Sequence, residues 1–156
     1  MGVRLVKNYI VKSGSIDDLK GIVVLDRVVF VLSRTPEEIE DKLKLQKDVH
    51  ITVATISDGR LVGYGIGHEY KGKYYLWSLA VLPEYRRKGI GSEIIDEQNN
   101  FAREKGYASF LVKTSNRWKE MLRLLLKKEF NIIGFKEHEW EDGPLGSAIW
   151  LEKNIL

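Results

Sequence analysis

Hydrophobic and polar residues follow two periodic patterns along almost the whole chain. Alternation at every second position is typical of a β-strand with one buried face, and apolar residues three or four positions apart are typical of an amphipathic helix. The strand-like stretches are residues 3–11, 50–57, 61–70, 74–82, 108–114, 132–140 and 147–152. Four stretches are helical. The first begins at Ser15 and ends near Ser33, the second begins at Thr35, and the third follows Gly91 to about Lys105. The fourth spans residues 117–129, with Trp118, Leu122, Leu125 and Leu126 on its buried side.

Capping and turn residues support these boundaries. Ser15 and Thr35 can accept hydrogen bonds from free helix amides, and Thr35 is followed by Pro36 and, at the third helical position, by Glu38. Short turns, including Asp58-Gly59, join the strands of residues 50–82 into an antiparallel meander. We therefore expect the element order βααβββαβαββ, an α+β fold with a mixed, mostly antiparallel sheet flanked by helices, in a single domain over residues 1–156.

Composition excludes several classes of site. The 156 residues include no cysteine, which rules out disulfides, thiolate metal ligands and a cysteine nucleophile. Three histidines without metal-ligand spacing predict no metal site. The net charge of +3 does not indicate a nucleic-acid partner. No apolar run is long enough for a membrane span or a signal peptide, so we expect no membrane partner and a cytoplasmic location.

The most informative stretch is Arg86-Arg87-Lys88-Gly89-Ile90-Gly91, which joins a strand to a helix. Free amides and the positive end of a helix dipole bind phosphate, and glycines let a ligand approach the main chain. A Rossmann fingerprint requires a third glycine where Ile94 stands. A Walker loop requires a lysine, which Gly91-Ser92 lacks. An ordinary strand-to-helix turn remains as the alternative.

This stretch resembles the Arg/Gln-x-x-Gly-x-Gly/Ala signature of the GCN5-related N-acetyltransferases, and Val81-Leu82-Pro83-Glu84-Tyr85 precedes it as in many members. The predicted element order is similar over essentially the whole chain. The resemblance implies a transferase that uses acetyl-CoA as co-substrate and moves the acetyl group directly to a primary amine, of a small molecule or of a protein. The alternatives are a catalytically silent acyl-CoA-binding module and an interaction domain with a degenerate pocket.

The resemblance also implies which residues hold the cofactor. The pyrophosphate would bind the turn and the helix start, the pantetheine arm would bind the main chain of the preceding strand, and an asparagine after the next strand would steady the cofactor. In this sequence these residues are Leu79, Ala80, Val81, Arg86, Arg87, Lys88, Gly89, Ile90, Gly91, Ser92 and Asn116.

The catalytic groups depart from the family pattern. Many members carry a general-acid tyrosine four residues before a Gly-Phe pair at the last helix–strand junction; with Gly134 taken as that glycine, the position holds Phe130, which has no proton to donate. Candidate bases near the middle of the sheet are His68, Glu69 and Tyr75. Strand alternation points His68 and Glu69 to opposite faces. We take Glu69 and Tyr75 as the catalytic candidates.

The acceptor and the oligomeric state are open at this stage. The acceptor candidates are a polyamine, an amino acid, a lysine side chain and a protein N-terminus. Aromatic residues that can line an acceptor groove are Tyr70, Trp77, Trp118 and Trp140, and an acidic tract that can attract a cationic amine comprises Glu137, Glu139, Glu141 and Asp142. A homodimer would be possible if residues 147–152 formed an exposed edge strand.

Overall fold

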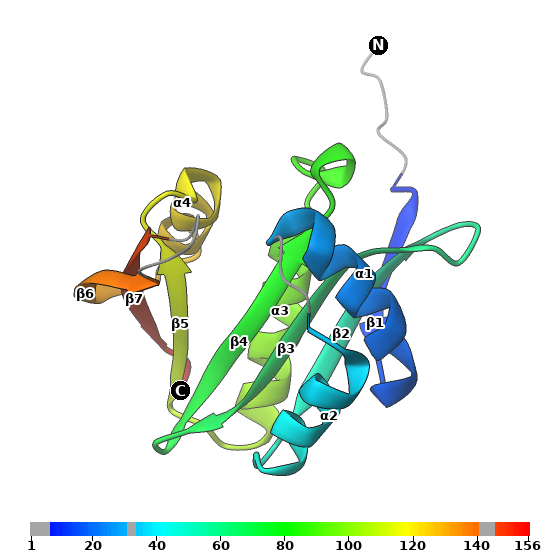
Figure 1. Ribbon diagram of the computed structural model, residues 1–156. Coiled ribbons are helices and arrows are strands. Elements are labelled where there is room, and N and C mark those ends of the chain that lie inside the picture. Colours follow the sequence, from blue (N-terminus) through cyan, green and yellow to red (C-terminus); the bar gives the residue numbers. More distant parts are fainter. Residues whose placement is uncertain (1–6, 31–33, 141–145) are drawn as a thin grey trace.

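A computed structural model describes residues 7–30, 34–140 and 146–156, and shows one seven-stranded sheet with helices on both faces (Figure 1). The strands are β1 (Tyr9–Ser13), β2 (His50–Ile56), β3 (Leu61–Tyr70), β4 (Lys73–Val81), β5 (Ser109–Ser115), β6 (Asn131–Trp140) and β7 (Gly146–Asn154). The helices are α1 (Leu19–Val29), α2 (Pro36–Lys44), α3 (Ile90–Glu104) and α4 (Lys119–Lys127), with short 3-10 helices η1 (Ile16–Asp18) and η2 (Pro83–Tyr85).

The strand order in the sheet is β1-β2-β3-β4-β5-β7-β6. Every neighbouring pair is antiparallel except β4 and β5, which run parallel because α3 carries the chain between them. The helices α1 and α2 lie on one face of the sheet and α3 lies on the other (Figure 1). The predicted mixed α+β class is therefore confirmed.

The predicted helix starts are confirmed at the level of individual hydrogen bonds. Ser15 and Asp18 form a reciprocal capping box at η1, and Thr35 and Glu38 form another at α2. The first long helix ends at Val29, before the predicted end near Ser33, which lies outside the described residues. The first strand begins later than predicted, at Tyr9, and residues 1–6 lie outside the described range.

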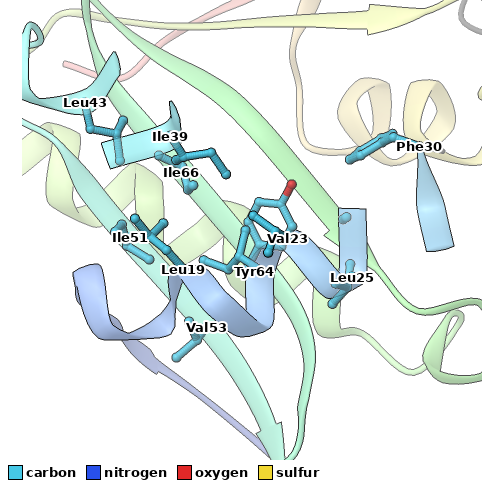
Figure 2. Close-up of a cluster of buried hydrophobic side chains, with 12 residues drawn as sticks. Leu19, Val23, Leu25, Phe30, Ile39, Leu43, Ile51, Val53, Tyr64 and Ile66 are labelled. Carbon is cyan, nitrogen blue, oxygen red and sulfur yellow. The ribbon is translucent and has the colours of Figure 1, made fainter. Parts of the chain in front are cut away.

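One hydrophobic core lies between α1, α2 and the sheet (Figure 2). It joins Leu19 and Val23 of α1 and Ile39 of α2 to Val53 and Tyr64 of the sheet. Phe30, just after α1, belongs to the same cluster but lies apart from the others, toward α4 (Figure 2). Its ring centroid is 5.0 Å from that of Trp118, so the end of α1 contacts the segment between β5 and α4.

The opposite face holds a second core in which Phe110, Phe130 and Leu125 are buried. Phe130 is therefore a core residue. The prediction that Leu126 is buried is wrong, because it is 45% exposed. Within α4 it is Leu125, at 0% exposure, that points into this core, and its direct neighbour Leu126 lies about 100° further round the helix.

The last strand is not an edge of the sheet. β7 pairs with β5 on one side and with β6 on the other. The expected pairing of residues 147–152 between subunits is therefore wrong, because both hydrogen-bonding edges of that strand are already used within the chain. No helix in the described ranges is both long and apolar enough to cross a membrane.

Candidate active site

The sheet opens between β4 and β5. The two strands pair only from Tyr74 to Leu76 and from Phe110 to Val112, although both continue further and diverge in Figure 1. On its other side β4 carries a bulge, where Ile66 pairs with Ser78 and Gly67 pairs with Leu76. Trp77 is the extra residue, and the local twist of a bulge turns the rest of β4 away from β5.

A cavity of about 820 Å³ lies between the end of β4, the start of α3 and α4. Most of the predicted cofactor residues line it, namely Leu79, Ala80, Val81, Arg86, Arg87, Gly89, Ile90, Gly91 and Ser92. It is long and partly apolar, with Val29, Phe30, Trp118, Met121 and Leu124 on its walls. A cavity of this size, apolar along β4 and with free amides at one end, suits an acyl-CoA better than a mononucleotide.

The glycine turn has the backbone that phosphate binding requires. Arg87 and Gly89 adopt positive φ angles of 61° and 92°, and α3 starts at the next residue, Ile90. The first amides of a helix have no intrahelical partner. A Cβ atom on Gly91 would lie 3.6 Å from Leu124 and 3.9 Å from Val81, both of which line the cavity. The missing side chain at Gly91 therefore opens the cavity itself.

Basic side chains surround this end of the cavity. The Nε atom of Arg86 donates to the carbonyl oxygen of Val81 at 3.0 Å, and Arg87 pairs with Glu120 at 2.8 Å. The helix α4 and the residues before it add further cations, which sequence reasoning did not assign to the cofactor: Arg117, Lys119 and Arg123. Their only sequence signal was a basic polar face on α4, which is common on exposed helices.

Two predicted cofactor residues lie outside this cavity. Lys88 does not line it, and its Nζ atom lies 5.2 Å from the ring centre of Tyr85. Asn116 binds the start of β7. Its backbone N–H donates to the backbone carbonyl of Ser147 at 2.9 Å, and its side-chain Oδ1 atom accepts from the backbone N–H of Ser147 at 3.1 Å. Contacts of either residue with the cofactor stay a prediction.

A second cavity of about 190 Å³ lies in the opening between β4 and β5. It shares Phe30, Leu79, Trp118 and Met121 with the first, so the two adjoin. Its other lining residues are Arg34, Tyr75, Leu76, Trp77, Ser78, Val112, Lys113 and Thr114. Of the aromatic residues expected in an acceptor groove, Trp77 and Trp118 line this cavity.

Of the two catalytic candidates, only Tyr75 lines this cavity. Burial, together with the neighbouring Tyr70 and Glu139, raises the pKa of Tyr75 to about 12, so its hydroxyl keeps its proton at neutral pH. The carboxylate of Glu69 instead accepts from the amide of Gly72 at 2.6 Å, in the turn between β3 and β4, and lines neither cavity. The chemical roles of Glu69 and Tyr75 stay predictions.

A buried hydrogen-bond chain that the sequence did not reveal ends at the second cavity. Tyr64 donates to Asp26, which pairs with Arg34 at 2.5 Å, and the Tyr64 oxygen lies 2.7 Å from the hydroxyl of Ser78. Because the single hydroxyl hydrogen of Tyr64 goes to Asp26, the remaining bond must run from Ser78 to Tyr64. Ser78 therefore offers lone pairs to the cavity.

The prediction that Phe130 occupies the position of the family's general-acid tyrosine is wrong. Gly134 and Phe135 lie inside β6, and Phe135 is 58% exposed. The helix–strand junction lies earlier, where Glu129 has the left-handed φ of 69° and Phe130 is buried. The position four residues before this junction is Leu125, which is fully buried in the core. The family spacing was counted from Gly134, which lies inside β6 and not at the junction, and Phe130 is a core residue.

We expect Phe130→Tyr to leave kcat unchanged, because Phe130 lines neither cavity and a hydroxyl there cannot reach the thioester. The new hydroxyl would be buried against Phe110 and should cost about 1–2 kcal/mol of folding free energy. Initial rates and urea denaturation of the variant check both expectations. A several-fold rise in kcat would show that an acid acts from this position after all.

The chain belongs to the Acetyltransferase (GNAT) family: the sequence model of that family matches residues 19–142. Acetyltransferases of this family use acetyl-CoA as co-substrate, and the match gives no support to a catalytically silent module. Within the described residues, no group of histidine, aspartate and glutamate side chains is arranged to hold a metal ion.

Solved structures of acetyltransferases share the fold. Ard1 from Thermoplasma volcanium is 20% identical, with a TM-score of 0.83 over 96% of this chain and 99% of that chain. The ribosomal-protein-S18-alanine N-acetyltransferase from Escherichia coli is 16% identical, with a TM-score of 0.81 over 94% of each chain. A phosphinothricin acetyltransferase from Sinorhizobium meliloti, in complex with AcCoA, is 15% identical, with a TM-score of 0.80 over 95% of this chain and 89% of that chain.

Proposed function

We propose that the protein is an N-acetyltransferase that binds acetyl-CoA in the first cavity and transfers its acetyl group directly to a primary amine in the second. The observation that carries this proposal is the junction of the two cavities in the opening between β4 and β5. Acetyl-CoA in the first cavity would place its thioester at the junction, and an amine in the second cavity would reach the thioester from the other side. The N-acetyltransferases among the similar folds support an amine as the acceptor.

The cofactor would be held mainly by the main chain. The start of α3, with Gly89 and Gly91, would bind the pyrophosphate, and the edge of β4 that β5 leaves free would bind the pantetheine arm. Backbone amides of that edge would polarise the thioester carbonyl. Arg86 keeps the end of β4 in place through its bond to the Val81 carbonyl.

The amine would be positioned by Ser78. A neutral amine can donate one N–H to the free lone pairs of the Ser78 oxygen while its own lone pair faces the carbonyl carbon. Tyr75, which stays protonated, would serve as a hydrogen-bond donor in the same cavity rather than as a base. No covalent enzyme intermediate is required: the nitrogen–carbon bond forms as the carbon–sulfur bond breaks, and the proton that the nitrogen loses passes, through water, to the departing CoA thiolate.

Two measurements test the proposal. Calorimetric titration with acetyl-CoA, with ATP and NAD as controls, should show saturable binding of acetyl-CoA alone. Release of the free CoA thiol should then depend on an added primary amine. Binding without amine-dependent release from any amine of a broad panel would contradict the transferase assignment, and absence of binding would contradict the cofactor site.

A further inference from the structure

The second cavity presents cations, and no carboxylate, to the acceptor. Its charged lining residues are Arg34 and Lys113, and no aspartate or glutamate is among the described residues that line it. A cavity built for a polyamine or another polycationic acceptor would need the opposite charge. At about 190 Å³ this cavity is much smaller than the first, at about 820 Å³.

Two residues that line this cavity each carry a buried polar atom without a hydrogen-bond partner among the described residues: Nε of Arg34 and Oγ1 of Thr114. Thr114 is only 3% exposed, so its hydroxyl is shielded from bulk water. A buried polar group without a partner costs free energy, and such groups are often completed by a ligand. An oxygen anion in the cavity would satisfy both the guanidinium and the hydroxyl.

The described carboxylates nearest the cavity are already shared among partners within the protein. Asp26 is shared between Arg34 and Tyr64, and Lys42 adds a second cation 4.1 Å from the ring of Trp77, on which Arg34 also lies at 4.8 Å. On the β5 side, Glu139 is shared between two lysines, with distances of 3.4 Å to Lys113 and 2.9 Å to Lys136. Near Arg34, the described residues therefore place two cations, Arg34 and Lys42, beside one shared carboxylate.

We propose that the acceptor of this enzyme carries a carboxylate close to its reacting amine, with the carboxylate bound by Arg34 and Thr114 in the field of Lys113. The amine would lie at Ser78, which is joined to Arg34 through Tyr64 and Asp26. The two ends of the acceptor would thus meet one hydrogen-bonded unit. This inference rests on the proposed function, because it assigns the second cavity to the acceptor.

Two kinds of acceptor carry a carboxylate close to a primary amine: a free amino acid, and a peptide whose N-terminal residue is acidic. Thiol release by the full chain is measured with leucine, leucinamide and 3-methylbutylamine, and with two short peptides that differ only in an N-terminal Asp or Asn. Rates are compared per concentration of neutral amine, so that differences in amine pKa do not count. In the leucine series, in the peptide pair, or in both, we expect kcat/KM to be at least about tenfold higher for the compound with the carboxylate. A factor of this size corresponds to the free energy of one hydrogen bond to a charged group.

Substitutions in the cavity should remove this preference. Arg34→Gln is expected to lower kcat/KM for the carboxylate acceptor by about tenfold more than for the uncharged acceptor, and to leave the affinity for acetyl-CoA nearly unchanged. Because this change also disturbs Asp26, Thr114→Val provides a second test: it removes an unpartnered hydroxyl, so stability should hold or rise while the carboxylate acceptor alone reacts more slowly. The control is Lys44→Gln, a lysine with a 64% exposed side chain on α2, which should change nothing.

A preference for leucine would identify free amino acids as the source, and a preference for the Asp peptide would identify protein N-termini. Equal rates with charged and uncharged members of both sets would overturn the proposal, as would a preference that survives both Arg34→Gln and Thr114→Val. In either case amine-dependent release would persist, and the transferase assignment would stand. Binding of acetyl-CoA with no release from any amine would overturn both together.

Discussion

Gly91→Glu should abolish measurable binding of acetyl-CoA while the protein stays folded. The new side chain would start 3.6 Å from Leu124 and 3.9 Å from Val81, inside the first cavity, and would put a negative charge beside the pyrophosphate site. Two like charges about 5 Å apart repel by about 3 kcal/mol in a partly buried setting. That corresponds to at least a hundredfold loss of affinity. Calorimetric titration measures the loss directly.

Two control variants separate charge from folding. Gly91→Ala adds only a methyl group at ordinary contact distance in a helical position, so we expect affinity to change by less than about threefold and helix stability to increase. Asn100→Glu adds the same charge to an exposed position of the same helix, away from its N-terminus, and should not affect affinity. If Gly91→Glu bound acetyl-CoA as tightly as these controls, the cofactor would not occupy the first cavity.

Most residues that line the proposed cofactor cavity could be predicted from sequence because they are close together along the chain. Free amides, a positive φ at Gly89 and a helix start all arise within a few consecutive residues. A six-residue pattern therefore carries most of the information about the phosphate cradle. The meander and the helix caps were predictable for the same reason, since each depends on neighbours along the chain.

The polar residues of the second cavity could not be predicted, although Tyr75, Trp77 and Trp118 were, because they come from distant parts of the chain. Arg34 follows α1, Ser78 lies on β4, and Thr114 lies on β5; only the opening of the sheet brings them to one cavity. Spacing arguments fail across such distances, as the misplaced junction at Gly134 shows. Glu69 was chosen for its place on a strand near the opening, yet its carboxylate accepts a bond in the β3–β4 turn.

Asp26→Ala should destabilise the protein more than any surface change. Asp26 is 0% exposed, and its removal leaves the Arg34 guanidinium and the Tyr64 hydroxyl without their shared acceptor. Breaking a buried ion pair from one side costs about 3 kcal/mol or more. Urea denaturation monitored by tryptophan fluorescence gives the difference in free energy of unfolding. Asp41→Ala, which removes a 79% exposed carboxylate 4.0 Å from Lys44, should cost less than about 0.5 kcal/mol.

Adding Tyr64→Phe to Asp26→Ala tests whether the two side chains act as a unit. The double variant no longer buries a Tyr64 hydroxyl that has lost its Asp26 acceptor, so it should lose about 1 kcal/mol less than the sum of the single changes. Strict additivity would show that the bond between Tyr64 and Asp26 contributes nothing. Because neither Asp26 nor Tyr64 lines the proposed cofactor cavity, acetyl-CoA affinity should persist in every folded variant. The turnover number should fall, since Ser78 loses the partner whose orientation leaves its lone pairs facing the amine.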